Sequence, residues 1–189
     1  MAKISDKRQA IFNATLRLVS EHGFHGTSIA MIYKEAGVSA GSVYHYFSSK
    51  DELVVELYKE LKKKIAKEVR INDDDDVPLR QKIWEAWDQI IRYEIENSIE
   101  STFLAQFSKS PYCTMEIERE VFIDYRKIME LFERGIKEMV IKRLPPMVYN
   151  TFSIDVAHSI AQKSKIGMIE LTEDLKRTIV ESTWEAIKM

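Results

Sequence analysis

The chain has 189 residues, of which 45% are hydrophobic and 31% are charged, a composition that excludes a largely disordered protein. Its single cysteine, Cys113, excludes an intramolecular disulfide and a multi-cysteine zinc site, which is typical of a reducing compartment. The formal charge of −2 is unevenly distributed, because residues 1–50 carry six Lys and Arg against three Asp and Glu, whereas residues 51–189 carry 22 against 27. A basic N-terminal quarter indicates a polyanionic partner for that quarter alone.

The apolar spacing predicts an all-α chain with about nine helices and no strands. Scarce glycine and proline, with six and four residues, also favour long helices. The expected helices cover residues 5–22, 27–35, 39–46, 49–70, 78–97, 98–108, 114–143, 149–165 and 173–188. The first residues lead into no apolar segment typical of a secretory signal, and no run of about 18 apolar residues occurs. We therefore expect a cytoplasmic protein that does not contact a membrane.

The acidic run Asp73–Asp76 interrupts the helical pattern, because four adjacent carboxylates repel one another and stay solvated. Together with the short helices before it, this run predicts a small N-terminal helix-turn-helix domain over residues 1–52. A larger helical domain then covers residues 53–189, and the helix at about 49–70 links the two. The run lacks the alternating carboxylates and the turn glycine of a calcium loop, so we expect no metal there.

No residue pattern in the chain is typical of a catalytic site. His22 and His25 flank Gly23 at an expected helix end, where they fit capping rather than metal ligation. Cys113 has no histidine near it in the sequence, and no glycine-rich phosphate loop is present. We expect neither enzymatic activity nor a metal or cofactor.

The segment with the clearest functional pattern covers residues 27–53. Two short helices are separated there by the turn Ala36–Val38, and Gly37 suits the left-handed position after a helix. A three-residue turn with glycine between short helices is typical of a helix-turn-helix motif. On spacing alone, an ordinary helical hairpin with a polar face explains the segment equally well.

The second of these short helices has two different faces. It begins with Ser39-Ala40-Gly41-Ser42, whose small side chains let the backbone approach a groove or a phosphate closely. Val43 and Phe47 are four residues apart and face the core. Tyr44 and His45 then point outward, and both can donate hydrogen bonds to phosphate.

A set of short motifs occurs along this part of the chain: Gly23-Phe24, Thr27-Ser28-Ile29, Ala36-Gly37-Val38-Ser39, Gly41-Ser42-Val43-Tyr44, Tyr46-Phe47, Lys50-Asp51 and Leu53. Through these residues the chain resembles the TetR family of bacterial transcriptional regulators. The resemblance covers about residues 5–53. The remainder resembles the family only in the number and length of its helices. The resemblance implies a DNA-binding N-terminal domain and a C-terminal domain that dimerises and binds a small-molecule effector.

The resemblance also implies roles for individual residues. Phosphate or groove contacts are expected from Thr27, Ser28, Ser39, Ala40, Gly41, Ser42, Tyr44, His45 and Lys50, with Lys50 as a phosphate anchor. Ala40 stands where many members have Lys or Arg, and alanine can contact a thymine methyl group but cannot read guanine bidentately. Base readout by this helix is therefore expected to be sparse, with a larger share for backbone and shape readout.

The last helix has two apolar lines, which favours burial on two sides, one against its own core and one against a partner subunit. The helix from about residue 149 adds apolar and small residues that permit close packing. The expected dimer contacts are Phe152, Val156, Ile160, Val180, Trp184 and Ile187. Two such helices from each subunit would form a four-helix interface. A monomer with a well-covered terminal helix is the alternative.

Aromatic and methionine residues recur at helical spacing in the middle of the chain, where they form either a plain core or the wall of a plastic apolar cavity. As cavity residues they would be Trp84, Trp87, Ile91, Glu94, Phe103, Phe107, Phe122, Tyr125 and Met129. Glu94 on this inward line needs a partner, either an internal base such as Arg126 or a cationic ligand.

The sequence thus predicts a homodimeric, DNA-binding repressor that recognises a palindromic operator and is released by a small, mainly apolar effector. The first alternative is a DNA-binding protein of the same fold with a closed cavity, regulated by a protein partner or not at all. The second is an all-α enzyme, which would need a cavity with clustered, perturbed titratable groups.

Overall fold

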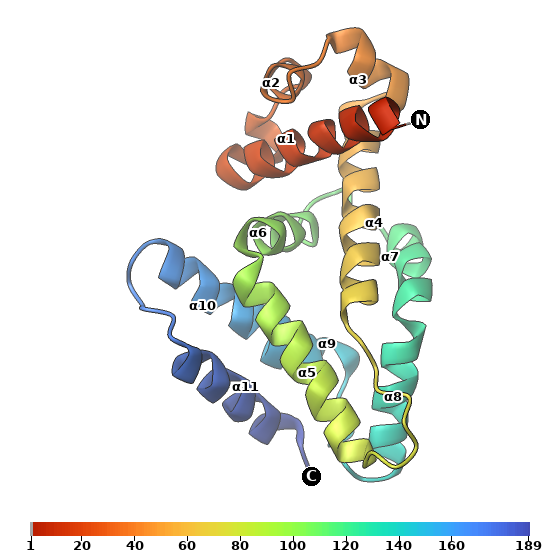
Figure 1. The fold of residues 1–189 in the computed structure, drawn as a ribbon, viewed down its shortest axis with the longest axis vertical. Coiled ribbons are helices and arrows are strands. Elements are labelled where there is room, and N and C mark those ends of the chain that lie inside the picture. The colour runs from red at the N-terminus through yellow and green to blue at the C-terminus, as the bar shows by residue number, and fades with distance from the viewer. Residues whose placement is uncertain (1) are drawn as a thin grey trace. The chain divides into compact units, whose positions relative to one another are not determined.

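The chain is almost entirely helical in the computed structural model, which describes residues 2–189, with side chains from Asp6 onward (Figure 1). This described part contains no β-strand, and an isolated β-bridge joins Ile141 to Lys188. The helices form nine segments when those that follow one another without a break are counted together. The predicted all-α class and the predicted number of about nine helices are therefore confirmed. No helix in residues 2–189 is both long and apolar enough to span a membrane.

The helical segments lie close to the predicted ranges, with differences at their ends. In chain order they are α1 (Ala2–Gly26), α2 (Ile29–Glu35), α3 (Ala40–Tyr46), α4 (Lys50–Glu68), α5 (Leu79–Glu96), α6 (Ser98–Phe107), α7 (Met115–Phe122) with η1 (Ile123–Tyr125) and α8 (Arg126–Lys137), α9 (Pro146–Asn150) with η2 (Thr151–Asp155) and α10 (Val156–Lys165), and α11 (Glu173–Ile187). The helix predicted over 114–143 is thus interrupted by the 3-10 turn η1 and ends at Lys137.

Two compact units make up the chain. The first combines the chain up to Lys62 with Ile99–Glu118, and the second combines Lys63–Ser98 with Arg119–Met189. The predicted boundary between residues 52 and 53 places all of α6 in the larger domain, whereas α6 from Ile99 onward belongs to the first compact unit. That boundary remains a prediction, because compactness does not define an independently folding domain.

The core of the first unit is built from apolar residues that helical spacing places on one face of each short helix. Ile11 and Phe12 of α1, Ile32 of α2, Val43 of α3 and Leu53 of α4 are at most 1% exposed. The Arg8 guanidinium lies 4.3 Å from the centre of the Phe12 ring and so covers this core from outside.

α6 completes the first unit with an aromatic cluster. Phe103 and Phe107 are fully buried, and the Phe24 ring meets them edge-on with centroids 5.6 and 6.4 Å away. Tyr58 stacks on Phe107 at 3.9 Å, and Tyr112 packs against Phe24 at 5.3 Å. Ring contacts of this kind fill space closely, so the cluster is a solid core.

α5 is the central helix of the second unit, and α8, α10 and α11 pack around it (Figure 1). Ile83, Trp87 and Ile91 of α5 are at most 1% exposed, and the Trp87 indole donates a hydrogen bond to Thr183 of α11 at 3.0 Å. Gly135 lets α8 approach closely, since a Cβ atom there would lie 2.3 Å from the Ile83 side chain.

Candidate nucleic-acid interface and effector-binding unit

Serine side chains begin both helices of the helix-turn-helix. The Ser28 hydroxyl accepts the backbone N–H of Met31 at 3.2 Å, and the Ser39 hydroxyl accepts that of Ser42 at 3.2 Å. Both serines are N-caps that satisfy otherwise unpaired amides of the first turn. Between the helices, Gly37 has φ +65°, a conformation that side chains rarely adopt, so the predicted turn is formed as the sequence indicated. α2 itself begins one residue after Ser28 rather than at Thr27.

α3 presents a polar outer face and an apolar inner face. Val43 is fully buried and Phe47 is 2% exposed, whereas Tyr44 is 57% exposed and His45 is also exposed. Ser39 and Gly41 are exposed as well, and Ala40 and Ser42 are half-buried. A Cβ atom on Gly41 would meet no atom nearer than 4.0 Å, so the space before this first turn is open. The outer face can therefore approach a groove without any rearrangement of the core.

Thr27 and Lys50 have internal contacts that the sequence did not reveal. Thr27 is 1% exposed, and its hydroxyl donates to the Gly23 carbonyl at 2.8 Å. The Lys50 ammonium donates to the carbonyls of Phe24 at 2.7 Å and Thr27 at 3.0 Å. A lysine that satisfies carbonyls at the end of a helix stabilises that end. Both side chains thus hold the junction of α1 and α2, and a DNA contact by either remains a prediction.

The start of α4 is fixed by the predicted capping box and one further contact. The Ser49 hydroxyl accepts the backbone N–H of Glu52 at 3.1 Å, as the spacing indicated. The Glu52 carboxylate accepts from Ser48, from its N–H at 2.6 Å and from its hydroxyl at 2.5 Å. The hydroxyl and the N–H of Ser48 hold the pKa of Glu52 below its ordinary value. The reciprocal bond of the capping box therefore goes to Ser48 instead of Ser49.

Comparison with known families explains this arrangement. Residues 11–57 match the family described as bacterial regulatory proteins, tetR family, and residues 78–188 match the tetracyclin repressor-like C-terminal domain. The chain belongs to the TetR family. It is therefore a TetR-type transcriptional regulator with a helix-turn-helix domain, and regulators of this family bind DNA.

Individual relatives agree with this assignment over most of the chain. An HTH-type transcriptional regulator of Haemophilus influenzae is 24% identical over 186 residues, which cover 97% of each chain. The regulator BetI of Vibrio parahaemolyticus is 28% identical over 139 residues, which cover 71% of this chain and 68% of the relative. A TetR family transcription regulator of Marinobacter aquaeolei has the same fold, with a TM-score of 0.88, 23% identity and coverage of 99% and 98%.

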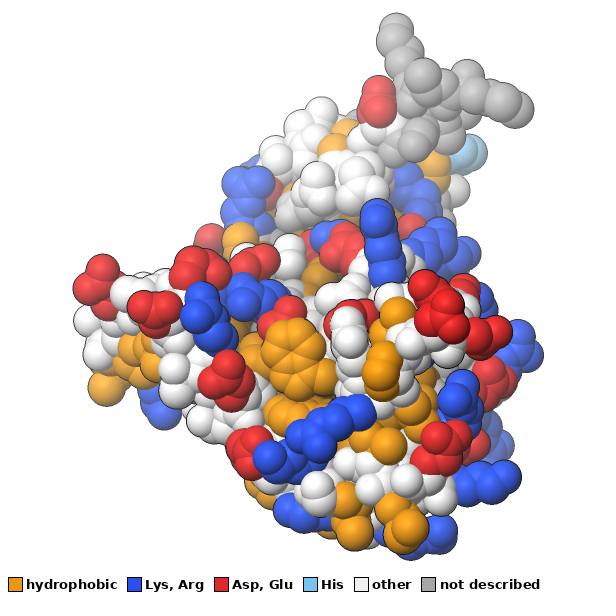
Figure 2. Space-filling view, turned by 60° about the horizontal axis from the view of Figure 1, so that its bottom comes forward, with side chains coloured by type: hydrophobic (Ala, Val, Ile, Leu, Met, Phe, Trp, Pro, Cys, Tyr) orange, Lys and Arg blue, Asp and Glu red, His pale blue; other side chains and the backbone are white. Residues whose placement is uncertain are grey.

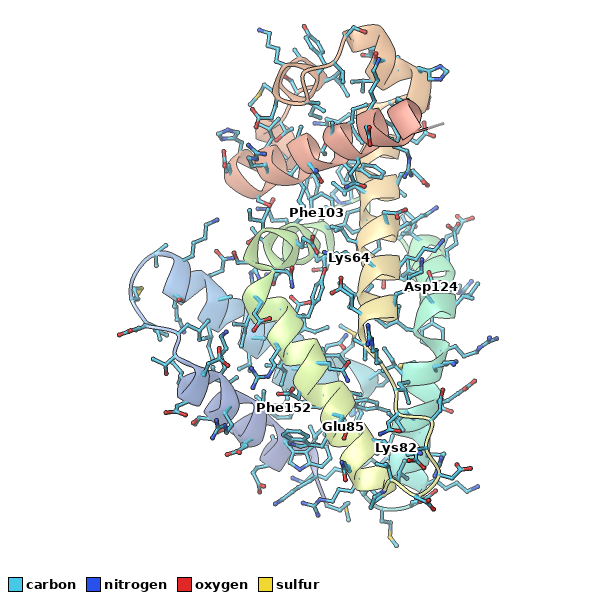
Figure 3. All side chains as sticks on the ribbon, viewed as in Figure 1. Lys64, Lys82, Glu85, Phe103, Asp124 and Phe152 are labelled. Atoms are coloured by element: carbon cyan, nitrogen blue, oxygen red, sulfur yellow. The ribbon has the colours of Figure 1, made fainter. Side chains whose placement is uncertain are left out.

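Most side chains that were expected to line an effector cavity are buried within the two units, and a role in effector binding remains a prediction for them. Trp87, Ile91, Phe103 and Phe107 are at most 1% exposed, and Glu94 is 4% exposed. They also divide between the two units, because the two phenylalanines lie on α6, where Figure 3 labels Phe103.

The remaining residues of the expected cavity have three different environments. Phe122 is 52% exposed, so its side chain faces outward. Tyr125 and Met129 are half-buried. Trp84 is also half-buried and lines a surface hollow of the second unit. Aromatic spacing alone could not separate these environments, because a core stripe and a cavity stripe share one period.

Two surface hollows lie side by side in the second unit, and the segment Arg70–Ile71 borders both. One, of about 350 Å³, is lined by Trp84, Glu85, Asp88 and Gln89 of α5 together with Arg70–Asn72. The other, of about 400 Å³, is lined by Ala66 of α4, by Val69, Arg70 and Ile71 after it, by Asp124 of η1, and by Lys127 and Ile128 of α8. Both volumes are within the range of small-molecule pockets, roughly 300–1,000 Å³.

The expected dimer contacts divide into two groups. Val180, Trp184 and Ile187 are at most 5% exposed within the single subunit, so they pack against its own core, and a contact with a partner remains a prediction for them. They belong to the face of α11 that packs on α5. The opposite face of α11 includes the exposed Glu181 and Ser182 and is polar, since the second apolar line is too short to form a stripe.

The other group lies on η2 and α10. Phe152, Val156 and Ile160 are all half-exposed and stand at intervals of four residues. They form an apolar line on the surface of a helix, and Phe152 is labelled in Figure 3. Figure 2 shows hydrophobic side chains gathered among charged ones on the face that it turns forward.

Proposed function

We propose that this regulator is a repressor that binds a palindromic operator as a homodimer and is released by a small-molecule effector. The outer face of α3 supports DNA binding most directly. Small or polar side chains begin the helix, Tyr44 and His45 follow on the exposed side, and Val43 and Phe47 fix the helix to its unit. Such a helix enters the major groove with its first turn against the base edges.

The DNA contacts we propose divide by chemistry. Ser39, Ala40, Gly41 and Ser42 approach the base edges, where Ala40 offers a methyl contact to thymine. Ser28, Tyr44 and His45 contact phosphates, which position the protein and carry no direct sequence information. No arginine stands on the outer face of α3, so readout through DNA shape contributes a larger share than usual.

The homodimer is supported by the half-exposed line Phe152, Val156 and Ile160. A stripe of this kind, flanked by the polar and exposed Asp155 and Ser159, is typical of a helix that packs on a second copy. In the dimer, two-fold symmetry would set two α3 helices on one DNA face about one turn apart, roughly 34–36 Å, or a multiple of it.

Selection from a pool of random duplexes tests this function without knowledge of the natural operator. Repeated capture with the full-length protein is expected to enrich an inverted repeat. Ser42→Ala is expected to change the relative affinity among selected variants. Enrichment of a single unrepeated site, or of no sequence, would contradict the proposal.

The close packing of the expected cavity residues favours a second candidate, in which a protein partner replaces the small molecule. In the first unit Phe103 stacks on Phe107, and in the second unit Trp87 packs on Phe132, with Trp87, Phe103 and Phe107 each at most 1% exposed. Only a protein fraction would then release the operator complex, whereas a deproteinised extract would leave it intact. Release by the small-molecule fraction favours the first candidate.

A further inference from the structure

The hollow between the end of α4 and the start of α8 combines an apolar floor with charged side chains. Val69 and Ile128 are buried at 6 and 7% exposure, and Ala66 and Ile71 are half-buried beside them. Arg70, Lys127 and Asp124 complete the lining, and Figure 3 labels Asp124 at this place. Two cations thus face one carboxylate above an apolar surface.

Both cations of this hollow are available to a ligand. The structure gives no ion pair or hydrogen bond to the Arg70 guanidinium or to the Lys127 ammonium among the described residues. The exposed Arg17 and Arg134, by contrast, are paired with Glu35 and Glu138. Asp124 pairs with neither of them within 4.0 Å. An anion would therefore displace only water from the two cations, and it would avoid the cost of breaking an existing pair.

The backbone of Arg70 is held in place by α5. The side-chain amide of Gln89 accepts the Arg70 N–H at 2.8 Å and donates to the Arg70 carbonyl at 3.0 Å. The same amide group donates to the Glu85 carbonyl of its own helix at 3.0 Å. This two-point contact fixes the backbone of the residue just beyond the end of α4, so the Arg70 side chain starts from a defined Cα position and no backbone freedom is lost there on binding.

We propose that this hollow binds an amphipathic anion, a carboxylate with an unbranched or compact apolar tail. The Arg70 guanidinium would bind the carboxylate in a bidentate manner, with Lys127 as a second cation. The tail would cover Val69, Ile71 and Ile128. Binding of this anion is independent of the proposed function, but the further proposal that the bound anion is the effector that releases DNA rests on it.

Binding is tested by calorimetry with the full-length protein in the absence of DNA. The probes are decanoate, decanol and decyltrimethylammonium, which share a tail and differ in the charge of the head group. Decanoate is expected to bind at least about tenfold more tightly than the other two probes. The reason is that only decanoate has a carboxylate that can pair with the Arg70 guanidinium and the Lys127 ammonium. Equal binding of the three probes, or preference for the ammonium compound, would overturn the proposal.

Variants locate the site. Arg70→Gln is expected to weaken decanoate about tenfold and to leave decanol unchanged. Lys63→Gln is the matched control, because it removes an exposed lysine of α4 that does not line the hollow. Ala66→Phe is expected to block the tail and weaken both decanoate and decanol. Equal effects of Arg70→Gln and Lys63→Gln would place decanoate elsewhere and overturn the site.

The regulatory role is measured separately, as release of the selected inverted repeat by decanoate. Release that is lost in Arg70→Gln supports the effector role. If decanoate binds through Arg70 and DNA stays bound, the site stands and its role as the effector site is overturned. If no DNA is bound in the first place, the proposed repressor function fails while the binding result is unaffected.

Discussion

Replacing Lys50 by methionine separates a structural role of this lysine from a role as phosphate anchor. Methionine keeps most of the apolar stem and removes the ammonium, which donates to the carbonyls of Phe24 and Thr27 at 2.7 and 3.0 Å. A hydrogen bond to a charged group contributes about 1.5–3 kcal/mol in buried surroundings. Since Lys50 is only half-buried and water can satisfy the two carbonyls, we expect a total loss of about 2 kcal/mol.

The assay is thermal and urea unfolding together with DNA binding over a salt series. For a chain of this size, a loss of about 2 kcal/mol lowers Tm by roughly 4–8 °C. The slope of log affinity against log salt is expected to stay unchanged, because no phosphate contact is removed. Lys67→Met, a matched change of an exposed lysine on the same helix, is expected to stay within about 0.5 kcal/mol. An unchanged Tm with a salt slope reduced by about one phosphate per subunit would refute this reasoning and restore Lys50 as a phosphate anchor.

Four further substitutions test the packing, the dimer and the capping of α4. Gly135→Ala is expected to cost about 1–3 kcal/mol in urea unfolding, because its Cβ would lie 2.3 Å from the Ile83 side chain; stability equal to that of the parent would contradict the packing. Val156→Glu is expected to give a folded monomer in sedimentation, and an intact dimer would place the interface elsewhere. Trp184→Ala is expected to lower the free energy of unfolding by about 3–5 kcal/mol, since Trp184 is 5% exposed in the single subunit. The ionised Glu52 carboxylate stabilises the fold at pH values above its ordinary pKa of 4.5, and this contribution is lost as the pH falls through the lower pKa of the folded state. Glu52→Gln is expected to remove this dependence of the free energy of unfolding on acidic pH. Identical stability profiles of parent and variant between pH 3 and 6 would show that the Ser48 contact contributes nothing.

Local signals in the sequence were sufficient for the helix-turn-helix. Ser39 and Gly37 act on their own neighbours, one as a cap and the other through its left-handed backbone, so their effect can be deduced without the tertiary fold. The inward and outward faces of α3 follow from the four-residue spacing of Val43 and Phe47 in the same way. The local structure of the helix-turn-helix was therefore predictable residue by residue, except for the internal contacts of Thr27 and Lys50.

Contacts between distant segments could not be deduced in this way. Lys50 and Phe24 are 26 residues apart, and nothing in either neighbourhood indicates that the ammonium meets that carbonyl. Apolar periodicity likewise shows that Trp184 is buried, but not whether its own core or a partner buries it. The hollow beside Arg70 depends on three separate elements, so it becomes visible only once they are packed.

The most direct test of the central claim is a methylation-protection footprint on the selected duplex, which reports guanine N7 atoms in the major groove and adenine N3 atoms in the minor groove. Two α3 helices of a dimer are expected to protect two patches on one face of the DNA, with centres about one helical turn apart or a multiple of it, roughly 34–36 Å per turn. Ser42→Ala is expected to alter protection in both patches symmetrically. A single patch, or protection confined to the minor groove, would contradict DNA recognition by paired α3 helices.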